Sequence, residues 1–312
     1  MHSGFVAVVG RPNVGKSTLV NRMVRAKVAI TSTRPNTTRH RILGVLHDAG
    51  ADAQVVFVDT PGIHRPRSTL GTRLNETAMD ALHDVDMIMA MVDATAPVGP
   101  GDRIVLERAV RQVRHAAGAK GRDETAADER DARAVPGLVV VVNKVDRASR
   151  SGVLERLAQA KETVDGLGEP PPVEYFPVSA RQGQGVDELR AYLVSRLPEG
   201  PPFFPPDVVT DTPEALWVAE LVREQLLAKT RDELPHAITC RVTEWEWPHI
   251  RVEIIVERDS QKAIVIGKGG EVLKEVGIAV RQSLPEGTYL DLHVKVERHW
   301  QNRAEMLDRL GY

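Results

Sequence analysis

The first two thirds of the chain alternate short apolar runs with longer stretches in which apolar residues recur at helical spacing. This alternation is typical of a mainly parallel sheet covered by helices. Several runs are apolar at nearly every position, as expected of strands buried on both faces. The predicted strands are Phe5 to Val9, Gln54 to Val58, Met87 to Val92, Leu138 to Val142 and Glu174 to Pro177. We therefore predict an α/β domain over residues 1–197.

A proline-rich segment, residues 198–206 (PEGPPFFPP), ends this pattern. Its prolines fix φ and stiffen the backbone, so we predict a linker between two domains. Beyond it the pattern predicts a helix, two strands, a short helix, a glycine turn, a longer helix and a strand, at residues 213–229, 236–245, 250–257, 261–266, 267–270, 271–283 and 289–297. This order predicts a smaller α+β domain over residues 207–312.

Residues 116–136 are rich in Ala, Gly, Arg, Asp and Glu and have no apolar periodicity. Segments of this composition bury too little apolar surface to pack well. We predict an exposed, mobile insert here, and its residues indicate no function.

The composition is that of a soluble globular protein, with 42% hydrophobic and 27% charged residues. No apolar run approaches the roughly 20 residues of a membrane-spanning helix, and the start of the chain lacks the pattern of a secretory signal. We expect a cytoplasmic protein. Cys240 is the only cysteine, which excludes an intrachain disulfide, and it is predicted to be a small core residue. The net charge of -2 gives no general attraction to nucleic acid, so any RNA binding must be local.

A glycine-rich loop follows the first predicted strand and fits the pattern GxxxxGK[ST]. In such loops backbone N–H groups and a helix N-terminus face the phosphates of a nucleotide. Lys16 would reach the outer phosphates, and Ser17 offers a hydroxyl to magnesium. The alternative is a glycine turn that binds no nucleotide. The predicted GTP contacts in this loop are Gly10, Arg11, Pro12, Asn13, Val14, Gly15, Lys16, Ser17 and Thr18.

Two further loops follow apolar strands. In the first, Asp59 can hold magnesium and the N–H of Gly62 can reach a γ-phosphate. In the second, Asp146 can accept hydrogen bonds from N1–H and N2–H₂ of guanine, a pattern that adenine lacks, which selects GTP over ATP. Ser179 and Ala180, after the last strand of the domain, would support the base. The predicted GTP contacts here are Asp59, Thr60, Pro61, Gly62, Ile63, Asn143, Lys144, Val145, Asp146, Ser179 and Ala180.

These four signals, taken in order, resemble the P-loop GTPases over about residues 4–197. Three segments resemble the Era family of bacterial GTPases in particular. They are TTRHR at residues 37–41, DTPGIH at 59–64 and VKVERHW at 294–300. The resemblance covers nearly the whole chain. It implies a GTPase that converts GTP to GDP and phosphate with Mg²⁺, and we predict that Lys16, Thr38 and Gly62 act in that reaction.

Residues 29–41 form a polar, proline-interrupted segment between the phosphate loop and the strand before Asp59. Such a segment is typical of a switch that γ-phosphate and magnesium order. Thr38 is the predicted magnesium ligand here, together with Ser17 and Asp59, and Thr37 is the alternative.

Ile63 stands where the Ras-like template has a glutamine that orients the attacking water. Because its side chain has no donor or acceptor, hydrolysis must rely on another group. Some GTPases with a hydrophobic residue at this place are similar in having an asparagine equivalent to Asn13, which ligates potassium. Potassium activation is a hypothesis, and the alternative is that Asn13 only suits a tight turn. His64 is either catalytic or a solvated residue of the switch.

The tetrapeptide at residues 267–270, GKGG, is a G-x-x-G turn flanked by two predicted helices. The order of elements around it resembles the type II KH fold, in which such a turn clamps single-stranded RNA. Residues 207–312 hold 14 Lys and Arg against 19 Asp and Glu, so groove shape must outweigh general electrostatics. A turn used only for packing or protein contact is the alternative. The predicted RNA contacts are Gly267, Lys268, Gly269 and Gly270, with Lys262 and Lys274 as lesser candidates.

The Era resemblance implies binding to the 3′ end of 16S rRNA and a part in 30S ribosomal subunit assembly. It also implies peripheral association with the cytoplasmic membrane, and we expect a monomer. One alternative is a GTPase whose C-terminal domain docks on a protein or membrane surface instead of RNA. Another is a nucleotide-gated binding module with negligible turnover.

Overall fold

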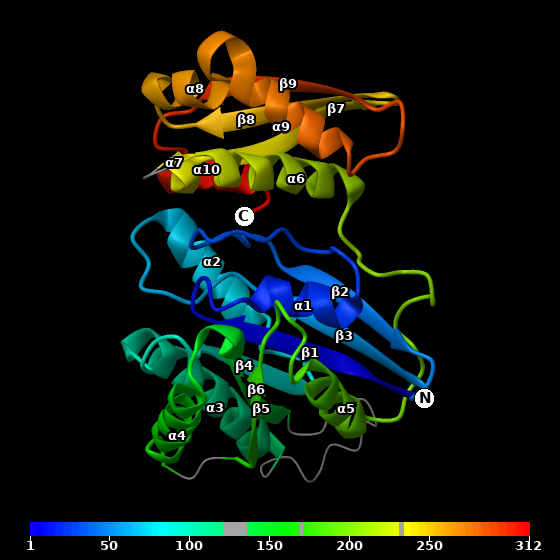
Figure 1. Ribbon diagram of the computed structural model, residues 1–312, viewed down its shortest axis with the longest axis vertical. Coiled ribbons are helices and arrows are strands. Elements are labelled where there is room, and N and C mark those ends of the chain that lie inside the picture. The colour runs from blue at the N-terminus through cyan, green and yellow to red at the C-terminus, as the bar shows by residue number, and fades with distance from the viewer. Residues whose placement is uncertain (121–135, 169–170, 231–233) are drawn as a thin grey trace. The chain divides into compact units, whose positions relative to one another are not determined.

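The computed structural model describes residues 1–120, 136–168, 171–230 and 234–312 (Figure 1). Contacts divide the chain into two units. The first unit is Met1–Ala29, Thr38–Arg65 and Leu74–Asp211, and the second is Ile30–Thr37, Pro66–Arg73 and Thr212–Tyr312. The division at residues 197 and 207 remains a prediction about domain limits.

The first unit is built on a six-stranded sheet with the order β2-β3-β1-β4-β5-β6. Neighbouring strands are parallel except β2, which pairs antiparallel with β3. The predicted mainly parallel sheet is therefore confirmed, and β2 is an edge strand that the prediction missed. The strands are β1 (His2–Gly10), β2 (Ile42–Asp48), β3 (Ala53–Asp59), β4 (Met87–Asp93), β5 (Gly137–Asn143) and β6 (Val173–Val178).

Helices cover both faces of this sheet, so successive residues of a strand enter different cores. Val6 and Val8 of β1 pack in one core with α1 and α5, and Ala7 and Val9 pack in the other with α2, α3 and α4. This alternation is why the central strands are apolar at nearly every position. The helices are α1 (Lys16–Val24), α2 (Thr69–Asp80), α3 (Pro100–Lys120), η1 (Val145–Arg147), α4 (Arg150–Asp165) and α5 (Val186–Arg196).

The predicted insert at residues 116–136 begins too early. Helix α3 continues through residues 116–120. Three of these five residues are alanine, the best helix former, and an established helix extends at little cost over such residues. Residues 121–135 lie outside the described residues.

The proline-rich segment is held along the first unit by Gln54, which is fully buried. The Gln54 Oε1 atom accepts from the backbone N–H of Phe203 at 2.7 Å, and Nε2 donates to the carbonyl of Phe204 at 2.8 Å. The rings of Phe5 and Phe203 lie 4.7 Å apart. The backbone of Val45 in β2 donates to the carbonyl of Val209 at 2.8 Å. Residues 203–209 are therefore anchored to strands β1, β2 and β3.

The second unit contains a three-stranded sheet with the order β7-β8-β9, in which β7 and β8 are antiparallel and β8 and β9 parallel. Its strands are β7 (Thr239–Glu246), β8 (His249–Val256) and β9 (Tyr289–Val296). Its helices are α6 (Glu214–Lys229), α7 (Leu234–Ala237), α8 (Asp259–Ile266), η2 (Lys268–Gly270), α9 (Glu271–Arg281), η3 (Trp300–Asn302) and α10 (Ala304–Arg309). This order confirms the predicted smaller α+β domain.

Two details of the second unit differ from the predicted elements. The strand predicted over residues 236–245 starts at Thr239, because His236 and Ala237 belong to the short helix α7. The predicted elements also missed α10 at the C-terminus. Cys240 is buried, as predicted. Among the described residues, no helix is both long enough and apolar enough to cross a membrane.

Candidate nucleotide-binding site and RNA-binding turn

The predicted phosphate loop connects the end of β1 to the start of α1, at the carboxyl edge of the sheet. The Nζ atom of Lys16 donates to the carbonyls of Gly10 and Arg11 at 3.3 and 3.2 Å. The lysine side chain thus lies back over the loop, where it would meet the outer phosphates of a nucleotide. Asn13 is exposed and has a left-handed φ of 65°, which asparagine tolerates better than most residues.

Three oxygen atoms converge beside this loop. The Ser17 hydroxyl donates to Asp59 Oδ2 at 2.6 Å, and the hydroxyls of Ser17 and Thr38 lie 2.7 Å apart. Asp59 is fully buried, and its Oδ1 atom has no hydrogen-bond partner among the described residues. Hydroxyl and carboxylate oxygens suit Mg²⁺, so the donor set fits this ion. Thr37 instead donates its hydroxyl to the carbonyl of Arg34 at 2.7 Å, which favours Thr38 as the ligand.

Burial perturbs the two charged groups at this place in opposite directions. It raises the pKa of Asp59 to about 6, against the effects of Lys16, Ser17 and Thr38. It lowers the pKa of Lys16 to about 8, against the effect of Asp59. Both shifts follow from moving a charge out of water. A bound polyphosphate would place negative charge beside Lys16. A divalent cation would place positive charge beside Asp59.

The Asp59 to Ile63 turn packs directly on the phosphate loop. The N–H of Ile63 donates to the carbonyl of Gly10 at 3.1 Å. A Cβ atom on Gly62 would lie 2.6 Å from the backbone nitrogen of Pro12, so only glycine fits there. The Ile63 side chain is 1% exposed and belongs to the core. It therefore points away from solvent, and it has no polar atom with which to orient water.

Thr60 and Pro61 belong to the same turn, and Thr18 lies in the first turn of α1. Thr60 is buried and donates its hydroxyl to the carbonyl of Val8 at 2.8 Å. Pro61 is buried, and Thr18 is half-buried in α1. One ring nitrogen of His64 lies 2.9 Å from the carbonyl of Gly62, so the imidazole is engaged by its own turn.

The loops predicted to bind the base are joined through Asn143. Its Nδ2 donates to the carbonyl of Val14 at 2.7 Å, and its Oδ1 accepts from the N–H of Ala180 at 3.0 Å. The hydroxyl of Ser179 donates to Asp146 Oδ1 at 2.6 Å. The structure thus brings together the phosphate loop and both base loops, and it aims the Asp146 carboxylate through a neighbouring hydroxyl. Val145 is buried beneath them.

Two carboxylates that support these loops were not among the predicted site residues. Asp93 Oδ2 accepts from Lys144 Nζ at 2.6 Å. Asp102 is 1% exposed, and its Oδ1 accepts from Arg11 Nε at 2.6 Å. Asp93 ends a buried strand, as Asp59 does, and that position was a readable signal. Nothing along the chain indicates that Asp102, in the first turn of α3, pairs with the phosphate loop.

The G-x-x-G segment forms the predicted turn between α8 and α9. Gly267, Gly269 and Gly270 have φ values of 75°, 62° and 82°, all left-handed. Lys268 and Lys274 are exposed, and Lys262 is half-buried. Because the turn carries little side-chain bulk and ends at the N-terminus of α9, its backbone is open to an anionic ligand.

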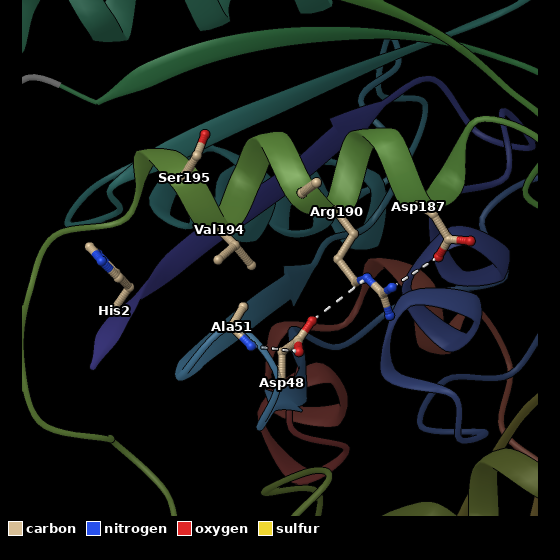
Figure 2. Close-up of a pocket in the computed structure, with 8 residues that line it drawn as sticks. His2, Asp48, Ala51, Asp187, Arg190, Val194 and Ser195 are labelled. Carbon is tan, nitrogen blue, oxygen red and sulfur yellow. Dashed lines mark hydrogen bonds and ion pairs between the residues drawn. The ribbon is translucent and has the colours of Figure 1, made fainter.

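One pocket of about 400 Å³ lies elsewhere, between β1, β2 and α5 (Figure 2). His2 at its rim is the first residue of β1, whereas the phosphate loop follows the last, so the pocket lies at the opposite edge of the sheet. Arg190 within it pairs with Asp187 at 3.1 Å and with Asp48 at 3.8 Å. Its charged groups are thus already paired with one another.

Known proteins match the chain over both parts. Residues 5–156 match the family model described as 50S ribosome-binding GTPase, and residues 233–301 match that of the KH domain. The GTPase Era of Mycobacterium tuberculosis (strain ATCC 25618 / H37Rv) is 44% identical, with 100% of this chain and 99% of that protein covered. The GTPase Era of Mycolicibacterium smegmatis is 43% identical, with 99% and 98% covered.

Two solved Era structures also match this chain over its full length. A variant of Era from Aquifex aeolicus bound to GDP.AlF4⁻ is 36% identical with a TM-score of 0.86, and 100% of this chain and 99% of that chain are covered. An Era structure in complex with MgGDPNP and nucleotides 1506–1542 of 16S ribosomal RNA is 36% identical with a TM-score of 0.85 and the same coverage. Full-length identity at this level, together with the nucleotide loops and the G-x-x-G turn, means that the chain belongs to the Era family of GTPases with a C-terminal KH domain.

Proposed function

We propose that this GTPase is a switch that binds single-stranded RNA at the 3′ end of 16S rRNA and acts in assembly of the 30S ribosomal subunit. The observation that carries the proposal is the open G-x-x-G turn, in which a Cβ atom built on Gly269 or Gly270 meets no atom within 4 Å. An RNA backbone has room to approach there. The related Era structure bound to nucleotides 1506–1542 supports this RNA as the ligand.

The nucleotide site supports specific roles in hydrolysis. We propose that the backbone of residues 10–18 cradles the phosphates of GTP while Lys16 neutralises them. Ser17, Thr38 and Asp59 would hold Mg²⁺, which when bound neutralises charge that develops on the phosphates. Gly62 would donate its N–H to the γ-phosphate, which is released when water attacks it. Asp146, aimed by Ser179, would read guanine.

Potassium activation through Asn13 is a separate part of the proposal. It is motivated by the apolar, buried side chain of Ile63, which leaves the developing charge and the water to other groups. We expect hydrolysis to be at least about tenfold faster in potassium than in sodium. We also expect Asn13→Gly to lose that difference. Glycine tolerates the left-handed φ of 65° and removes the side chain together with its oxygen.

This substitution separates the two explanations for Asn13. Single-turnover hydrolysis would be measured for both proteins in each salt, with GDP affinity as the control for an intact loop. Equal rates of the native chain in sodium and potassium would refute potassium activation. A variant that keeps the potassium effect would assign Asn13 to the turn alone.

Coupling between nucleotide binding and RNA binding is tested with a short RNA. We expect a short single-stranded RNA that copies the 3′ end of 16S rRNA to bind at least about fivefold tighter with GDPNP than with GDP, because a switch must bind its partner differently in its two states. Fluorescence anisotropy measures both affinities. Equal affinities would refute the switch, and absent binding would favour a C-terminal domain that docks on a protein or membrane surface.

The proposal also keeps the sequence-based division into residues 1–197, 198–206 and 207–312 as GTPase domain, linker and KH domain. It places the protein in the cytoplasm as a monomer, with peripheral contact at the inner face of the cell membrane. The family resemblance is the support for this placement.

A further inference from the structure

Asp102 lies in the first turn of helix α3, and its carboxylate is buried with a partner on each oxygen. Oδ1 accepts from Nε of Arg11 at 2.6 Å, and Oδ2 accepts from the backbone N–H of Gly99 at 2.9 Å. A buried carboxylate is costly unless it is paired, so Arg11 is what allows this charge to stay out of water. All three residues belong to the first unit.

Gly101 of α3 makes room for the Arg11 side chain. A Cβ atom built on this glycine would lie 2.6 Å from Cδ and 3.3 Å from Cγ of Arg11. Glycine is a poorer helix residue than alanine, by up to about 1 kcal/mol. A carboxylate that only stabilised the start of the helix would need neither this gap nor an arginine. The gap and the ion pair together indicate that the start of α3 holds the Arg11 side chain in place.

Arg11 is the second residue of the phosphate loop, and the peptide group that joins it to Pro12 is held from two sides. On one side, the Arg11 side chain is attached to α3 through Asp102. On the other, Pro12 has a fixed φ and packs against Gly62, where a Cβ atom would lie 2.6 Å from the Pro12 nitrogen. The planar peptide group between the two residues therefore has little freedom to turn.

The carbonyl of that peptide group contacts the lysine of the phosphate loop. Lys16 Nζ donates to the carbonyl of Arg11 at 3.2 Å and to that of Gly10 at 3.3 Å. The lysine is only 6% exposed, so these two carbonyls help to set where its ammonium group lies. A chain of contacts thus runs from Asp102 through Arg11 to the charged group that is proposed to meet the phosphates.

We propose that Asp102 is a positioning residue of the GTPase: it holds Arg11 and so keeps the Arg11 carbonyl where it places the Lys16 ammonium group for the phosphates. The inference rests on the proposed role of Lys16. It adds to the nucleotide site a residue 91 positions further along the chain than Arg11. Because a loop that is already fixed has a larger binding-competent fraction, breaking the pair should weaken binding of both GDP and GTP.

The test measures the affinity of the full chain for GDP and for GDPNP, each with Mg²⁺. Asp102→Asn keeps the size of the side chain and removes its charge. We expect this variant to bind both nucleotides about three- to tenfold more weakly. Arg11→Gln is expected to weaken binding as well, and Asp102→Asn should have no further effect in the Arg11→Gln background, because both substitutions remove the same interaction. Effects that simply add in the double variant would contradict the inference.

The matched control is Glu107→Gln, which breaks the 3.0 Å pair between Glu107 and Arg111 on the exposed side of the same helix. We expect it to leave both affinities unchanged. A role of Asp102 in the stability of α3 alone would lower the melting temperature and leave the affinities of the folded protein unchanged. The inference is therefore wrong if Asp102→Asn binds both nucleotides within about twofold of the native values.

Gly101→Ala provides the test if Asp102→Asn fails to fold. This variant leaves both charges in place and gives α3 a better helix residue, but its Cβ atom displaces the Arg11 side chain. We expect both nucleotides to bind about two- to fivefold more weakly, although the helix itself is favoured. Native affinity in Gly101→Ala would count against the inference.

Lys16→Ala distinguishes failure of the inference from failure of the proposed nucleotide site. If Lys16→Ala weakens binding of both nucleotides and the variants of Gly101 and Asp102 do not, the inference is wrong and the role of Lys16 stands. If Lys16→Ala has no effect, the proposed role of Lys16 fails, and the inference with it.

Discussion

Asp146→Asn is expected to change the base that the protein prefers from guanine to xanthine. The carboxylate accepts from two donors of guanine, N1–H and N2–H₂. An asparagine amide keeps one acceptor and turns the other into a donor, so it repels the guanine amino group and suits the C2 carbonyl of xanthine. One charge-assisted hydrogen bond is lost and the other becomes an uncharged one, together about 3 kcal/mol or roughly 10²-fold in GDP affinity.

Competition binding with GDP and xanthosine diphosphate measures this exchange. Ser179→Ala is the matched control, because it removes the 2.6 Å hydrogen bond that aims Asp146 and keeps the carboxylate. We expect this control to weaken binding of GDP and to leave the preference for guanine unchanged. If Asp146→Asn bound GDP as tightly as the native chain, Asp146 would not be the residue that reads guanine.

Gly269→Asp is expected to remove most RNA affinity and to leave GTP hydrolysis without RNA unchanged. A Cβ atom at this position meets no neighbour within 4 Å, so the turn has room for the side chain. The φ of 62° adds a strain of about 1–2 kcal/mol for an ordinary residue. The larger effect is electrostatic, because the new carboxylate lies where a phosphate must approach. We expect about 10- to 100-fold weaker binding at low salt.

Gly269→Asn distinguishes the effect of the negative charge on RNA binding from the effect of side-chain size. Asparagine has nearly the same size, tolerates the left-handed region and carries no charge. We expect it to bind RNA more tightly than Gly269→Asp, with a difference that shrinks as salt is raised. Anisotropy titrations at two salt concentrations measure this. Native RNA affinity in Gly269→Asp would mean that RNA does not contact this turn.

The parts of the fold that the sequence predicted have strong local signals, each with its own physical cause. Central strands are buried on both faces, so they read as unbroken apolar runs. Glycine turns at strand ends follow from the close approach of backbone to a phosphate. The five predicted strands of the parallel sheet and the G-x-x-G turn therefore lie within a few residues of the predicted positions.

The missed elements have weaker local signals. Strand β2 lies at the sheet edge, pairs antiparallel with β3 and ends in the polar residues His47 and Asp48. Residues 116–120 continue α3 although they show no apolar periodicity, because a helix once formed needs little burial to extend. The short helix α7 holds the proline Pro235 within its first turn, where proline is tolerated.

The sequence by itself determined the chemistry of the nucleotide site, because phosphate, magnesium and guanine each require particular residue types at the ends of buried strands. Only the tertiary structure favours Thr38 over Thr37 as the proposed magnesium ligand, since adjacent threonines are equivalent in a pattern but their hydroxyls bond different partners. It alone also revealed the bonds from Arg223 and Glu224 to a segment almost 200 residues earlier. Such contacts leave no local periodicity, because they depend on how distant parts of one chain pack.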